Sequence, residues 1–167
     1  MSPSISLLGA IHTIVSLIPI AAGLYGFVRY RFIEVSKHSG KLYLLGTVLA
    51  VLSSFAVSST GGINAGHAFG VVVLFFAFGG VVAAKLRFLG RSRPYLATFG
   101  LSFSFLLSLV PGTNETLTRV PLSHPLAEGP TSPVIQLTLL AWLALFVVGF
   151  TLQCWLIRSR HSVNQPA

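Results

Sequence analysis

Acidic side chains are nearly absent from this sequence: its 167 residues include no Asp and three Glu, and charged residues make up 8%. A soluble domain carries about 25% charged residues, because its surface has to face water. Cysteine is equally scarce, since Cys154 is the single one, which excludes an internal disulfide and a cysteine-based zinc site. These absences exclude an ordinary soluble enzyme, a disordered chain and a disulfide-stabilised secreted domain. They predict an all-α protein embedded in lipid.

Long uncharged apolar runs dominate the chain instead. A helix that crosses a hydrocarbon core of roughly 30 Å needs about 20 apolar residues. The first run follows no basic side chain and exceeds the roughly 7–15 residues of a signal-peptide core, which favours a retained span. Turn-forming glycines and prolines divide the remaining runs. The sequence thus predicts one bundle of five transmembrane helices over residues 5–28, 42–59, 65–84, 95–111 and 134–157, with an irregular proline-rich outer cap over 112–133.

Positive charge gathers on one side of these predicted spans. Ten of the eleven Lys and Arg residues lie in the loops after the first and third spans or in the tail, and Arg119 alone lies on the other side. The positive-inside rule therefore predicts an N-terminus outside and a C-terminus in the cytoplasm, which agrees with an odd number of spans. The net charge of +8 is then explained by membrane lipids as partners, and not by nucleic acid, which needs a basic face on a soluble module.

Small residues mark the faces on which the helices are expected to pack. Helix association in lipid relies on glycine, alanine and serine, which let two backbones approach closely. Such stripes run along the first three predicted spans, which we expect to form one tight bundle. The last span is richer in bulky side chains and is expected to contact lipid or another subunit. Its bulky residues are Trp142, Phe146, Phe150 and Trp155.

The predicted spans contain no Asp, Glu, Lys or Arg. Ion-coupled transporters usually keep such a residue at mid-depth. Enzymes that hydrolyse or transfer groups need a nucleophile beside a base, or a carboxylate pair, and neither is found in the spans. The sequence therefore favours neither a transporter nor an enzyme. A small-molecule permease, which would need a polar path, is a third and weaker hypothesis.

Histidine is the remaining side chain with site chemistry inside the bundle. His12 lies on the small-residue stripe of the first span, while His67 begins the third span and His124 lies in the cap, all on the predicted outer side. Imidazole is the common ligand of haem iron, copper and zinc. We therefore consider His12 and His67 as ligands of haem b or a metal ion, with His124 as a third metal ligand. The alternatives are a buried His12 bonded to a neighbouring hydroxyl, an interfacial His67 and a solvated His124.

A family resemblance rests on these and a few further residues. After His12, the sequence has His38, Gly40 and Tyr43 where the second span begins, and Arg91-Ser-Arg93-Pro-Tyr95 before the fourth. The chain resembles an uncharacterised bacterial family of multi-pass membrane proteins, a domain of unknown function that pairs a first-helix histidine with a His-Gly-Tyr signature at helix 2. This resemblance implies the bacterial inner membrane and no particular activity. In outline the bundle is also similar to small membrane b-type cytochromes, in which histidines of facing helices clamp haem.

Two classes of function follow. The first is an electron-transfer protein that binds haem b or a metal ion through His12 and His67. The second is a non-catalytic accessory or scaffold subunit of a larger membrane complex, joined through the last span. A separate motif, Asn114-Glu-Thr116, is a glycosylation sequon on the predicted outer side and matters only in a eukaryotic secretory route.

Overall fold

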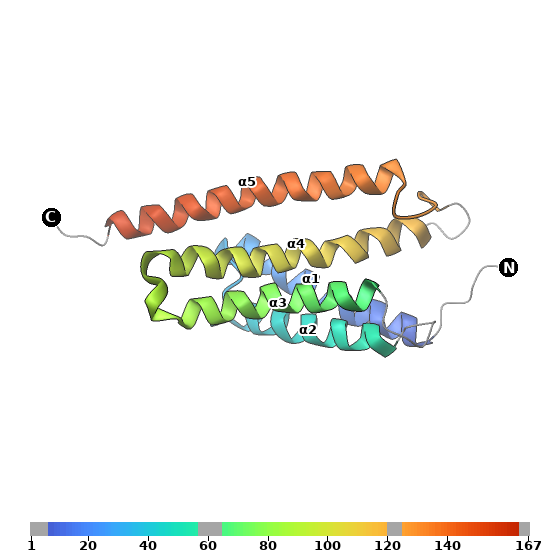
Figure 1. Cartoon of the computed structure of the whole chain (residues 1–167), viewed down its shortest axis with the longest axis horizontal. Coiled ribbons are helices and arrows are strands. Elements are labelled where there is room, and N and C mark those ends of the chain that lie inside the picture. Colours follow the sequence, from blue (N-terminus) through green and yellow to red (C-terminus); the bar gives the residue numbers. More distant parts are fainter. Residues whose placement is uncertain (1–6, 57–64, 120–124, 164–167) are drawn as a thin grey trace.

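The computed structural model describes residues 7–56, 65–119 and 125–163 (Figure 1). These residues form five α-helices and one short 3-10 helix. The five α-helices are each long and apolar enough to cross a membrane, which confirms the predicted all-α class and number of candidate spans. The elements are α1 (Leu7–Tyr30), α2 (His38–Ala56), α3 (Ala65–Lys85), η1 (Arg87–Ser92), α4 (Arg93–Arg119) and α5 (Pro133–Val163).

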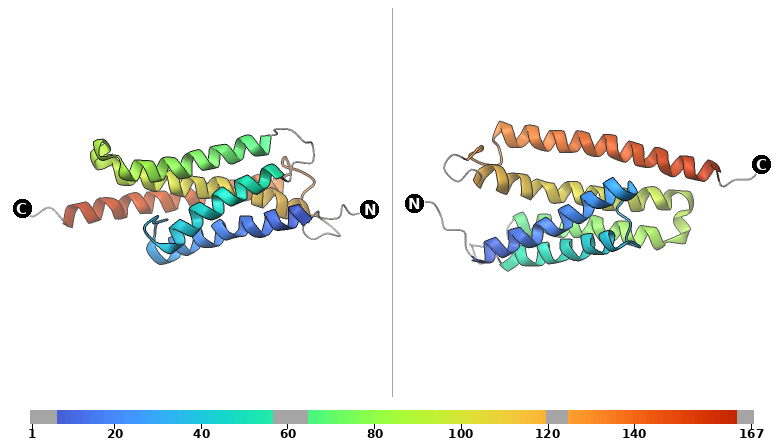
Figure 2. Two further views of the ribbon diagram at one scale, coloured as in Figure 1. Left: turned by 90° about the horizontal axis from the view of Figure 1, so that it is seen from below. Right: turned by 180° about the vertical axis from the view of Figure 1, so that it is seen from behind.

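The helices run along one common axis, and α5 lies at the edge of the bundle beside α4 (Figures 1 and 2). The start of α1 and the end of α5 lie at opposite ends of this axis (Figure 1). The end of α5 shares its end of the bundle with the α1–α2 turn and with η1, so the cations of these segments gather there. We call this the basic end of the bundle.

Glycines create the closest helix contacts. A Cβ atom added to Gly100 of α4 would lie 2.7 Å from the Cα atom of Gly80 in α3, so these two backbones touch. A Cβ atom on Gly46 of α2 would lie 2.8 Å from Cδ of Pro19 in α1. The expected small-residue contact between the first two spans is therefore present. Helix α3 packs most extensively against α4, where Gly80 meets Gly100, a partner that the sequence patterns did not indicate, whereas Gly70 of α3 faces Val51 of α2.

The predicted boundary that differs most from the structure is the end of the fourth span, while α2 also begins four residues earlier and α5 ends six residues later than predicted. The cap was expected to begin at residue 112, but α4 continues through Pro111 to Arg119. A proline removes one helical hydrogen bond, and the turns beyond it gain others that compensate. The irregular stretch is confined, among the described residues, to 125–132, and His124 lies outside them. Three interactions stabilise the added turns. Trp142 Nε1 donates to Thr113 Oγ1 at 3.1 Å, and Ala127 N donates to Leu117 O at 3.0 Å. Arg119 and Glu115 form an ion pair of 2.7 Å.

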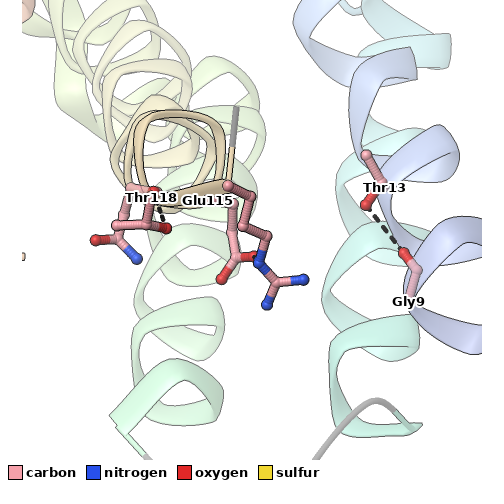
Figure 3. Close-up of polar contacts among 6 residues, drawn as sticks. Gly9, Thr13, Glu115 and Thr118 are labelled. Carbon is pink, nitrogen blue, oxygen red and sulfur yellow. Dashed lines mark hydrogen bonds and ion pairs between the residues drawn. The ribbon is translucent and has the colours of Figure 1, made fainter. Parts of the chain in front are cut away.

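This last turn of α4 carries the polar contacts drawn in Figure 3. The Glu115 carboxylate faces the guanidinium of Arg119 one turn further on, and the Thr118 hydroxyl donates to the carbonyl of Asn114 at 2.7 Å. Asn114, the residue of the sequon, is thus helical, and its Oδ1 atom is buried. N-glycosylation requires an accessible asparagine on a surface loop, so this geometry is unfavourable for it.

The outer surface of the bundle is apolar. Phe75 of α3 is 70% exposed and Trp155 of α5 is 64% exposed, whereas Tyr43 of α2 is fully buried. Exposed apolar patches of this extent are rare on soluble monomers and mark contact with a membrane or another protein. The distribution of side chains is therefore the one that the sequence composition predicts for a protein in lipid.

Candidate functional site

Polar side chains inside the bundle form hydrogen bonds between helices. In lipid such a bond ties two helices together, because a polar group left alone in hydrocarbon is costly. The described pairs join α1 to α2, α2 to α3, α2 to α4 and α4 to α5. They are His12 with Ser53, His67 with the carbonyl of Ser54, Tyr43 with Ser104, and Ser102 with Gln153, besides the bond from Trp142 to Thr113 described above.

His12 of α1 is bonded to α2 through its Nδ1 atom, which lies 2.7 Å from Ser53 Oγ. The Ser53 hydroxyl donates in turn to the carbonyl of Ala50 at 2.9 Å. Because that hydroxyl has a single proton, this chain of bonds assigns the proton to Nδ1 of His12 and leaves a lone pair on Nε2. The nearest polar partner of Nε2 among the described residues is Ser16 Oγ at 3.5 Å, and this hydroxyl already donates to the His12 carbonyl at 2.8 Å. His12 therefore combines a satisfied donor with a weakly engaged acceptor.

His67 of α3 has a different environment. Its side chain is 4% exposed, and its ring stacks on Phe55 with centroids 4.3 Å apart. Its Nε2 atom donates to the carbonyl of Ser54 at 3.3 Å. A nitrogen that donates a proton to a carbonyl does not bind a metal, so Nε2 of His67 acts here as a helix-joining donor.

The two histidines reach the same level of the bundle, since they contact the consecutive residues Ser53 and Ser54. They do so from different helices, His12 from α1 and His67 from α3. Within residues 7–56, 65–119 and 125–163, no three His, Cys, Asp or Glu side chains come together as a metal cluster would require. His124, the third predicted ligand, lies outside these ranges. Haem or metal ligation by His12 and His67 remains a prediction.

A second polar position, at Gln153 of α5, was overlooked in the sequence analysis. Gln153 is buried, and its two amide atoms bridge three segments of the chain. Its Oε1 atom accepts from Ser102 Oγ at 3.0 Å, and its Nε2 atom donates to the carbonyl of Arg31 at 2.8 Å. A carboxamide deep in an apolar run is itself a sequence signal, because such a group in lipid must find partners.

Arg31 has an unusual backbone conformation at this point. It follows the last residue of α1 and has a φ of 68°, the left-handed region that costs a residue with a side chain roughly 1–2 kcal/mol. Its N–H still donates to the carbonyl of Phe27 at 3.0 Å, while its own carbonyl is turned to Gln153. The bond from α5 therefore helps to stabilise the turn that ends α1.

Beside Gln153 lies a cavity between α1, α4 and α5, which we call the α5 groove. Its volume is about 450 Å³, and it is lined mainly by aromatic and aliphatic side chains. The polar residues along it are Arg31, Ser102 and Gln153. Pockets that bind small molecules have volumes of roughly 300–1,000 Å³, are mostly apolar and contain a few polar groups, and the α5 groove has these properties. Its apolar lining includes Phe27, Phe105, Leu109, Trp142, Phe146 and Leu156.

Comparison with known proteins adds no family assignment: no protein-family model, no curated protein and no solved structure matches this chain. What the fold itself defines is the coarser class, a helical bundle with five candidate membrane spans. Function has to be argued from the side chains described above.

Proposed function

We infer that this chain is an integral membrane protein that acts as a non-catalytic accessory subunit of a larger membrane complex. In this proposal the five helices span the membrane, the basic end faces the cytoplasm and α5 joins the partner. The first support is the apolar surface of the bundle. The second is that Ser102, Ser104 and Ser108 of α4 each donate to an acceptor within the protein, which disfavours a polar path along this helix. Ser102 donates to Gln153, Ser104 to Leu101 O and Ser108 to Ser104 O.

The observation that carries the proposal is the position of α5. This helix packs mainly against α4 and is the least buried of the five candidate spans. Large apolar side chains along it, such as Leu137, Leu140 and Val148, are each at least 59% exposed. A surface helix of this kind offers another membrane protein a long apolar face for van der Waals packing.

The test is the mass of the protein extracted in a mild detergent, measured by light scattering after size exclusion. We expect a complex of defined mass above the 17.8 kDa of one chain, with a second protein in fixed proportion. The double substitution Leu140→Ala with Val148→Ala should reduce the yield of that second protein. Phe75→Ala with Phe78→Ala, on the exposed face of α3, is the matched control. A homogeneous single chain, or an equal loss from both variants, would contradict the proposal.

A second candidate function is supported by the protonation of His12. A histidine that binds haem iron or a metal ion donates from one ring nitrogen and coordinates through the other. The bond from Nδ1 to Ser53 orients the ring in this way and leaves the Nε2 lone pair weakly engaged. The second candidate is therefore an electron-transfer protein with haem b or a metal ion on His12. A second ligand would come from the remaining outer-side histidines, as in the sequence-based hypothesis.

Absorption spectra of the oxidised and dithionite-reduced protein, with elemental analysis, test this candidate. We expect His12→Ala to abolish the haem band or the bound metal and Ser53→Ala to weaken it. His38→Ala is the control, because His38 is exposed at the opposite end of the bundle. A wild-type protein without a haem band or bound metal would eliminate this candidate.

A further inference from the structure

The α5 groove is long and narrow. Its lining on α5 extends from Trp142 to Leu156, which corresponds to roughly 21 Å at 1.5 Å per residue. Its interior volume is about 450 Å³. A helix with its side chains is roughly 10–12 Å wide, so its cross-section is on the order of 80–110 Å². A helix segment of this length would fill on the order of 1,700–2,300 Å³, so the groove cannot enclose a helix of a partner protein, and its length and apolar lining suit a hydrocarbon chain.

The charge along the groove is confined to one end. Arg31 lines the groove at the basic end, where the side chain is exposed. In the part of the chain that the structure describes, its guanidinium has no carboxylate or hydrogen-bond partner, and the nearby acid Glu34 does not pair with it. The guanidinium of Arg160 of α5 lies 5.2 Å from the ring of Phe32, the residue after Arg31, which brings a second cation to this end.

We propose that the α5 groove binds one acyl chain of an anionic phospholipid, with the lipid phosphate on Arg31. The aromatic walls pack against the acyl chain, and an arginine fork matches phosphate oxygens in geometry as well as in charge. The proposal rests on the proposed membrane location but not on the accessory-subunit role. A neutral lipid and an uncharged isoprenoid quinone lack the group that Arg31 would bind, so they are outcomes of the test.

The chain contains its own reporters for this site. Its two tryptophans, Trp142 and Trp155, both line the groove. The purified full-length protein is reconstituted into vesicles of phosphatidylcholine, in which a rising fraction of the lipid carries bromine on its acyl chains. Bromine quenches tryptophan fluorescence on contact. The variant Trp155→Phe leaves Trp142 as the single reporter. In this variant, brominated phosphatidylglycerol should reach half-quenching at a mole fraction about fivefold below that of brominated phosphatidylcholine. One cation near the membrane surface supplies a factor of this size.

Two pairs of variants separate the chain site from the phosphate site. Gly149 lines the groove and a Cβ atom there would meet no atom within 4 Å, so Gly149→Leu fills the groove without displacing the backbone. This variant should greatly reduce quenching by either lipid. Gly79→Leu, which is equally free of contacts but lies on α3, should leave quenching unchanged. Arg31→Gln should remove the fivefold preference, Arg31→Lys should restore part of it, and Arg91→Gln on η1 should leave it unchanged.

The outcomes are distinct. Equal quenching by both lipids in the wild type, unaffected by Arg31→Gln, overturns the phosphate site and leaves a groove for neutral chains. Quenching that Gly149→Leu does not change overturns the groove itself. An isoprenoid quinone can also be added at the same mole fraction as the brominated phosphatidylglycerol. If the quinone displaces this lipid and relieves the quenching, the site prefers the quinone and the proposal is wrong. Failure of the protein to enter vesicles, seen by flotation, would overturn the membrane location instead.

Discussion

The two faces of α4 both include phenylalanine pairs, such as Phe76 with Phe103 towards α3, but they differ in how closely the backbones approach. Towards α3, Gly100 meets Gly80 and the backbones touch, so no space remains between the helices. Towards α5, phenylalanines of both helices meet, as in the pair Phe99 and Phe150 with centroids 5.4 Å apart, and the α5 groove lies beside them. Glycine packing closes an interface because it brings two backbones together. Aromatic packing holds helices further apart and leaves spaces that other side chains or ligands fill.

The strongest way to break this comparison is to add the same side chain on both faces. In Gly100→Leu the new atoms overlap the backbone of α3, so α3 and α4 have to separate. Overpacking of this kind costs typically about 1–3 kcal/mol, and contact with backbone favours the upper end. In Gly149→Leu the side chain enters open space, and we expect the free energy of unfolding to change by under about 0.5 kcal/mol.

The measurement is unfolding by sodium dodecyl sulfate in mixed micelles, followed by circular dichroism. We expect the unfolding midpoint of Gly100→Leu to fall far below that of the wild type and the midpoint of Gly149→Leu to stay close to the wild-type value. Similar midpoints for the two variants would show that the two faces do not differ.

The second largest effect is expected for the hydrogen bonds of Gln153, on the face of α4 towards α5. Gln153→Leu leaves the buried Ser102 hydroxyl without its acceptor, which costs about 1–3 kcal/mol, and the Arg31 carbonyl, which water can reach, without its donor. We expect α5 to loosen, which the rate of maleimide labelling of the half-buried Cys154 would report. Gln136→Leu, an exposed glutamine near the start of α5, is the control. An equal labelling rate in both variants would mean that Gln153 does not hold α5 in place.

The smallest effect is expected for the hydrogen bond that joins α2 to α4. Tyr43→Phe removes the bond of 2.6 Å between α2 and α4, but the Ser104 hydroxyl keeps its own acceptor, Leu101 O, at 2.8 Å. Hydrogen bonds between membrane helices contribute on average about 0.6 kcal/mol. The same unfolding titration should therefore show a shift of about this size, against none for Tyr25→Phe, whose side chain is 55% exposed. A loss comparable to that of Gly100→Leu would contradict this ranking.

Sequence patterns predicted the helices well because apolar run length is a local property. They failed at Pro111, where helix continuation depends on contacts from Trp142 and Ala127 that are distant in sequence. They also placed His12 on an inward face, with Ser16 or Thr13 as the nearby hydroxyls in one alternative, whereas its close partner in the structure is Ser53 of α2 at 2.7 Å and Ser16 lies at 3.5 Å. The α5 groove was beyond prediction, because a cavity depends on how three helices approach one another. Gln153 was visible as a polar residue in an apolar run, but its partner at Arg31 is 122 residues away.

Membrane insertion with the basic end in the cytoplasm is the central claim, and cysteine labelling in intact cells tests it most directly. Cys154→Ser removes the single native thiol, after which Thr131→Cys in the cap and Ser36→Cys in the α1–α2 turn each supply one exposed thiol at opposite ends of the bundle. With a membrane-impermeant maleimide, the account predicts that Thr131→Cys reacts in intact cells and that Ser36→Cys reacts only after lysis. The reverse pattern would contradict the orientation. If both variants react only after lysis and the protein sediments apart from membranes, insertion itself is contradicted.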